Sequence, residues 1–101
     1  MQAKSQAYLL AERLLILTIS LMDEVNLENI AEMRTLMFER EVVLSSLEKM
    51  EIDEDAADVL FQVRHQEEKI ARALEKSHQL LIKELAQGFN TMQNIQNYLA
   101  S

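Results

Sequence analysis

Two charged residues interrupt apolar stripes of helical spacing, and together they are the strongest chemical signal in this chain. When the chain folds back as an antiparallel hairpin, Arg40 comes level with Glu67, and the apolar residues of the two stripes face each other. In any other register each charge would face leucine unpaired, which is unfavourable, so the spacing predicts a structural ion pair that fixes the register. The alternative, that the pair belongs to a polar site, stays open. The two stripes are Ile30, Met33, Met37, Arg40, Leu44 and Leu47, and Leu60, Val63, Glu67, Ile70, Leu74 and Ser77.

Other catalytic and metal-binding patterns are weak. Glu75 and His78 have the Glu-x-x-His spacing of di-iron carboxylate bundles, but such a site needs a second motif, and His65 with Glu68 has the reverse order. The chain has no cysteine, and its one glycine, Gly88, excludes a Gly-rich phosphate loop. We therefore expect no metal, no cofactor and no enzymatic activity.

Composition predicts an all-α fold in one domain spanning residues 1–101. The chain has no proline, one glycine, 49% apolar and 27% charged residues, whereas β-rich folds need many turn residues. The net charge of −7 argues against nucleic acid and anionic lipid surfaces as partners. The apolar stretch from Tyr8 to Met22 contains Glu12 and Arg13 and is too short and too charged to span a bilayer. With no cysteine, these features favour a cytoplasmic protein.

The elements expected to position these residues are four helices, over about 4–23, 27–50, 54–87 and 91–100. Asn26 is the predicted N-cap of the second helix, with Val25 and Ile30 as its hydrophobic staple, and Asp53 is the predicted cap of the third. Gly88 is placed to end the third helix. The prediction is an antiparallel up-down bundle of three long helices with a short C-terminal helix that either folds back or extends.

In this register the chain beyond about Leu81 extends past the second helix and keeps an apolar stripe. A lone helix would not display such a stripe to water. The tail either folds back at Gly88, pairs with a second copy or receives a partner helix. The stripe consists of Leu81, Leu85, Gly88, Met92, Ile95 and Leu99.

A second apolar stripe lies opposite the main one on each of the first two helices. Leu9 and Ile16 fall among polar residues on the first helix, and Phe38 and Val42 do so on the second. The stripes indicate a secondary interface: fourth-helix packing, a homodimer contact or a site for another protein.

A family resemblance rests on these spacings. Leu27-Glu28-Asn29-Ile30 is followed by Glu39-Arg40. After the acidic stretch at residues 51–55 come Glu67-Glu68 and, near the end, Tyr98. This pattern, which covers nearly the whole chain, resembles the FliT group of flagellar type III export chaperones, with the related FlgN group a near second.

The resemblance implies a cytoplasmic chaperone that binds the C-terminal helical region of a flagellar axial protein, of filament-cap or hook-filament type. It implies delivery to the export ATPase and gate, with Tyr98 for gate docking and the segment after Gly88 covering the binding surface. The alternative is a self-assembling coiled-coil structural or adaptor protein. The residues predicted to contact partners are Leu74, Leu81, Leu85, Met92, Ile95, Tyr98 and Leu99.

Overall fold

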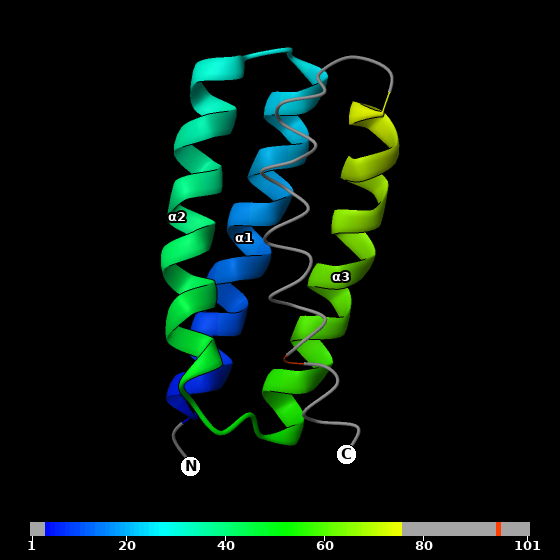
Figure 1. Cartoon of the computed structure of the whole chain (residues 1–101). Coiled ribbons are helices and arrows are strands. Elements are labelled where there is room, and N and C mark those ends of the chain that lie inside the picture. Colours follow the sequence, from blue (N-terminus) through cyan, green and yellow to red (C-terminus); the bar gives the residue numbers. More distant parts are fainter. Residues whose placement is uncertain (1–3, 76–94, 96–101) are drawn as a thin grey trace.

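The computed structural model describes residues 4–75 and Ile95, and within them the chain forms three long helices. α1 spans Gln6–Asn26, α2 spans Ile30–Glu48 and α3 spans Glu54–Leu74. They run up, down and up through two short turns (Figure 1). The predicted all-α up-down bundle is therefore confirmed for this part of the chain.

Each helix has a polar N-cap residue whose side chain accepts a hydrogen bond from a backbone amide in the first turn. Ser5 accepts from the amide of Tyr8 at 3.0 Å, and Asp53 accepts from the amide of Ala56 at 3.3 Å. Such caps satisfy amide groups that have no partner inside the helix. The prediction that Asp53 caps the third helix is confirmed.

The turn between α1 and α2 lies later than predicted. α1 continues through Asn26, and Asn29 caps α2 by accepting from the amide of Glu32 at 3.3 Å. The chain reverses at Glu28, whose φ of 55° lies in the left-handed region that is costly for a residue with a Cβ. The predicted Val25–Ile30 staple is wrong, because Ile30 is the first residue of α2 and not its fourth.

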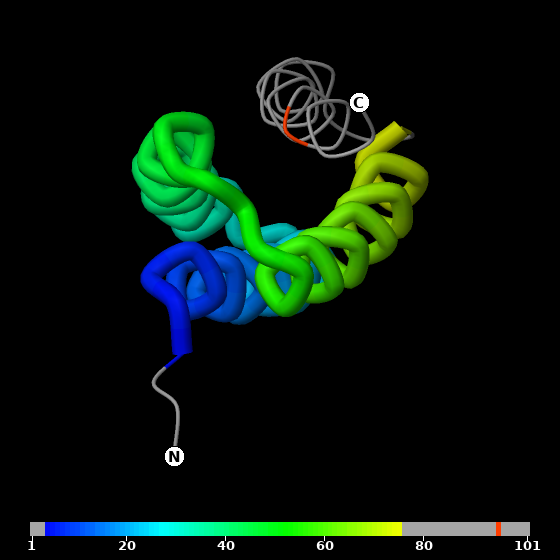
Figure 2. Tube along the Cα trace, turned by 90° about the horizontal axis from the view of Figure 1, so that it is seen from below, coloured from blue at the N-terminus to red at the C-terminus, as the bar shows by residue number. Residues whose placement is uncertain are grey.

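The three helices are arranged around α1. α1 packs against both α2 and α3, whereas along their described lengths α2 and α3 do not approach within 8 Å between Cα atoms. The end-on view shows α2 and α3 diverging on either side of α1 (Figure 2). The predicted close hairpin of the second and third helices is therefore wrong as a backbone contact, although both of their stripes enter one core.

The predicted third helix is too long. α3 ends at Leu74, with Glu75 as its C-cap, whereas the absence of any glycine or proline before Gly88 had suggested a helix to about residue 87. Ile95 is helical, as predicted, and is buried at 5% exposure beside the turn between α2 and α3. That turn is at the opposite end of α3 from Leu74. By residue 95 the chain has returned along the bundle, so the predicted overhang past the second helix is wrong at Ile95, whose position agrees with the fold-back alternative.

Within the described ranges, no helix is long and apolar enough to cross a membrane. α1, for example, is apolar on its buried side and carries charged residues on the opposite side. The core residues of α1 are Ala7, Ala11, Leu14, Leu17, Leu21 and Val25.

Candidate functional site

Three polar side chains meet inside the bundle, one from each helix. Arg40 on α2 is ion-paired with Glu67 on α3, and its Nε donates a hydrogen bond to Thr18 Oγ1 on α1 at 3.1 Å. Thr18 donates in turn to the carbonyl of Leu14 at 2.7 Å. The predicted ion pair forms, and Thr18 extends it into a buried polar chain that links all three helices.

Burial dominates the electrostatics of this cluster. It raises the pKa of Glu67 to about 7, since loss of water penalises the carboxylate and the positive charges of Arg40 and Arg64 offset this only in part. Burial also lowers the pKa of Arg40, opposed by the attraction of Glu67, but a guanidinium stays protonated at neutral pH. Glu67 Oε2 is buried and has no hydrogen-bond partner among the residues that the structure describes. The cluster therefore adds little net stability and acts mainly to set the heights of the helices relative to each other.

The alternative interpretation, that this pair forms part of a ligand site, is not supported, because the pair is closed off from solvent. The side chains of Arg40 and Glu67 are 3% and 0% exposed. A substrate or ligand would have to enter between packed helices to reach them.

Sequence reasoning missed Thr18. Its signal was present, because Thr18 lies four residues after Leu14 on the buried face of α1, where a polar residue needs a partner. The threonine hydroxyl bonds to the backbone of its own helix, as is common, so the pattern did not require a distant partner.

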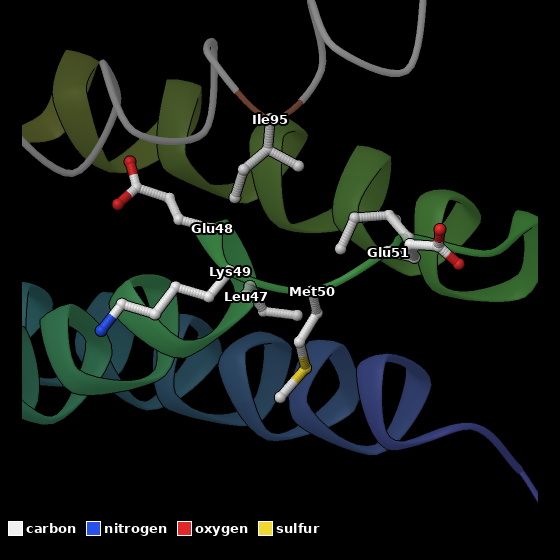
Figure 3. A pocket seen from close by; sticks show the side chains of 7 residues that line it. Leu47, Glu48, Lys49, Met50, Glu51 and Ile95 are labelled. Atoms are coloured by element: carbon white, nitrogen blue, oxygen red, sulfur yellow. The ribbon is translucent and has the colours of Figure 1, made fainter.

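A second candidate site is an open hollow of about 620 Å³ at the turn between α2 and α3. Ile95 lies on one side of the hollow and points toward the turn (Figure 3). Apolar and charged side chains alternate around it. The described residues that line it are Leu47, Glu48, Lys49, Met50, Glu51, Ile52 and Ile95.

The predicted partner-binding residues divide into two groups. Leu74 and Ile95 are both core residues, at 2% and 5% exposure, so neither side chain is open to a partner in this structure. The others lie outside the described residues: Leu81, Leu85, Met92, Tyr98 and Leu99.

The predicted secondary stripes are exposed. Leu9, Ile16, Phe38 and Val42 each keep more than half of their surface in solvent. Their exposure leaves them available for contacts with another molecule.

A further apolar surface was not predicted. On the α1–α3 side, Ile19 and Phe61 are also largely exposed and line a shallow groove with Leu15 and His65. Phe61 directly follows the buried Leu60, so its exposure follows from the helical period, but sequence alone did not show that Ile19 lies beside it.

Among the described residues, no group of three or more histidine, aspartate and glutamate side chains is placed to hold a metal ion. His78, the histidine of the weak Glu-x-x-His pattern, lies outside them. Comparison of the chain with family models, with curated proteins and with solved structures gave no match.

Proposed function

We propose that this protein is a non-catalytic cytoplasmic chaperone of the FliT type, which its hydrophobic pattern resembles. It binds a helical segment of a flagellar axial protein, of filament-cap type, and delivers it to the type III export apparatus. The observation that supports this most directly is the position of Ile95. A residue from the C-terminal part of the chain is buried against the α2–α3 turn, where its departure would uncover apolar surface.

The arrangement of the helices suits the recognition of one helix by a groove. α2 and α3 both pack on α1, but none of their Cα atoms come within 8 Å of each other, and the side chains of Arg40 and Glu67 span the distance between them. We propose that the apolar side chains of α2 and α3 beside this pair form the surface that another helix binds. Amphipathic helices bind such surfaces through apolar anchors three and four residues apart. Under this proposal Ile95 is one such anchor of the chain's own tail, and the client helix competes with the tail for the same apolar surface.

The test removes the tail and measures client binding. The probe is a labelled peptide from the C-terminal helical region of the filament cap protein of the same genome, titrated with the full chain, with a chain lacking residues 89–101, and with Ile95→Asp. If the tail occupies the groove, both variants should bind the peptide about tenfold more tightly, because a larger fraction of molecules is open. Unchanged or weaker binding by folded variants would contradict the proposal.

A matched control comes from an exposed apolar residue that does not line the hollow. Phe38→Ser removes a large exposed side chain that is absent from the lining of the hollow at the α2–α3 turn, and it should leave the affinity for the peptide unchanged. Circular dichroism of every variant checks that the helices remain formed.

The second candidate is the coiled-coil structural or adaptor protein, in which the tail serves only to pair two copies. The exposed stripes on α1 and α2 favour self-association, which supports this second candidate function. The same truncation separates the two functions, since an assembly subunit should lose its oligomeric state and gain no affinity for the peptide. Burial of Ile95 within its own chain supports the chaperone.

A further inference from the structure

The outer face of α1 and α2 carries apolar side chains that the protomer does not cover. Leu9 and Ile16 on α1 are 55% and 57% exposed, and Phe38 and Val42 on α2 are 71% and 54% exposed. Four large apolar side chains on two adjacent helices are more than the scattered single residues of an ordinary surface.

An ion pair shows that these side chains share one face. Arg13 on α1 and Glu39 on α2 are 3.5 Å apart, so they mark the side on which the two helices meet solvent together. Leu9 is four residues before Arg13 and Ile16 is three after it, which places both on the same side of α1 as the arginine.

On α2, Val42 is three residues after Glu39 and lies on the same side of the helix as the glutamate. Phe38 directly precedes Glu39 and points about 100° around the helix from it, on the Val42 side, so it lies at the outer edge of this face. Because α1 and α2 are antiparallel (Figure 1), Val42 lies toward the Leu9 end of the ion pair, and Phe38 lies toward its Ile16 end. The face is thus an Arg–Glu pair with one apolar couple on each side along the bundle.

We propose that this α1–α2 face is the interface of a homodimer, with a two-fold axis parallel to the bundle. That symmetry places α1 of each protomer over α2 of the other at the same height. Arg13 then lies over Glu39 of the partner subunit and the reverse, which forms a square of alternating charges. On one side of this square Leu9 meets Val42 of the partner subunit, and on the other Ile16 meets Phe38 of the partner subunit.

Charge pattern favours a second copy over an unrelated protein as the occupant. One arginine and one glutamate at the same height are complementary to themselves under this axis, as a two-fold interface requires. The local attraction also opposes the repulsion between two chains of net charge −7. Two helices of 21 and 19 residues, each about 10 Å across, present a face about 30 Å long and about 20 Å wide, or roughly 600 Å² before side-chain relief, which approaches the roughly 800 Å² a side of a stable interface.

This dimer does not depend on the proposed chaperone function, because Ile95 and the α2–α3 turn lie elsewhere on the bundle. The test is sedimentation equilibrium of the full chain over a concentration series reaching the high micromolar range. The wild type should be a dimer. Arg13→Glu makes the centre of the face wholly negative and Glu39→Arg makes it wholly positive, so each variant alone should dimerise about tenfold more weakly or worse.

The decisive sample is an equimolar mixture of these two variants. Opposite faces should pair, and the mixture should recover dimers about as well as the wild type, a result that an ion pair acting only within one protomer would not give. A monomeric wild type, single variants that dimerise normally, or a mixture that stays monomeric would each overturn the proposal.

Two exposed phenylalanines supply a matched control. Phe38→Ser should weaken the dimer about tenfold or more, whereas Phe61→Ser, on the α1–α3 side at 59% exposure, should leave it unchanged. The reverse pattern would place the contact on the α1–α3 groove and overturn the assignment.

Discussion

In the described part of the chain two arginine–glutamate pairs join helices, one inside the bundle and one on its surface. Arg40 and Glu67 are 3% and 0% exposed, whereas Arg13 and Glu39 are 57% and 42% exposed. The chemical groups are the same in both regions. Only the surroundings differ, and they give the two pairs different roles.

The buried pair cannot exchange its partner. Inside the core each charge has lost its water, so Arg40 depends on Glu67 and Thr18, and any slip of one helix would leave a charge among leucines. The surface pair of Arg13 and Glu39 is hydrated and contributes little to folding, so it is free to take a second pair of charges from another copy. Burial turns an ion pair into a determinant of register, and exposure leaves it available for association.

The largest expected effect comes from breaking the buried pair. Glu67→Ala leaves Arg40 as an unpaired buried cation and should lower the free energy of unfolding by about 3–5 kcal/mol, measured by urea denaturation. The double variant Arg40→Met with Glu67→Leu removes both charges and should recover most of this loss. If the double variant is as unstable as the single one, packing and not charge explains the loss.

The next largest effect is expected from pH, which should change the free energy of unfolding through the buried Glu67. The pKa of Glu67 is raised to about 7 in the fold from an ordinary value of 4.5, so between these values the folded protein binds a proton that the unfolded chain does not. Stability from this group is therefore complete below about pH 4.5 and is lost as pH rises through 7. The loss is no more than about 3.5 kcal/mol, since the shift is about 2.5 pKa units and each unit corresponds to about 1.4 kcal/mol.

Glu67→Gln isolates this effect, because it removes the titrating group and leaves the others unchanged. The difference in unfolding free energy between wild type and variant should fall with rising pH over that window and be flat above it. A difference that is constant from pH 4 to 8 would mean that Arg40 keeps Glu67 ionised throughout.

A smaller effect is expected from two threonines that differ only in burial. Thr18 and Thr35 each donate to the carbonyl four residues earlier, but only Thr18 is buried and accepts from Arg40. Thr18→Val should cost about 1–3 kcal/mol by leaving the Arg40 Nε unpaired, and Thr35→Val should stay within about 0.5 kcal/mol. Equal costs would show that the helix carbonyl contact, and not the link to Arg40, matters.

The smallest effect is expected at the surface pair. A double-mutant cycle on Arg13→Ala and Glu39→Ala, measured at concentrations where the protein is monomeric, should give a coupling energy of about 0–1 kcal/mol. A coupling as large as that of the buried pair would remove the contrast between the two regions.

Local sequence predicted what repeats along a single helix. Spacings of three and four residues predicted that the stripes around Arg40 and Glu67 are buried and that Phe38 is exposed. The cap at Asp53 was predicted from its residue type at the start of the helix. The prediction of Asn26 as the cap of α2 was wrong, and a local signal for the true cap was present, because Asn29 is followed three residues later by Glu32.

The sequence by itself therefore determined that this protein is helical, which side of each helix is buried, and that Arg40 and Glu67 meet. The tertiary structure alone decided that α2 and α3 pack on α1 and not on each other, that Thr18 joins the ion pair, and that Ile95 returns to the α2–α3 turn. The physical reason is that helical period identifies an apolar face but not the surface that covers it. That choice depends on the packing of segments far apart in the chain, which no local pattern encodes.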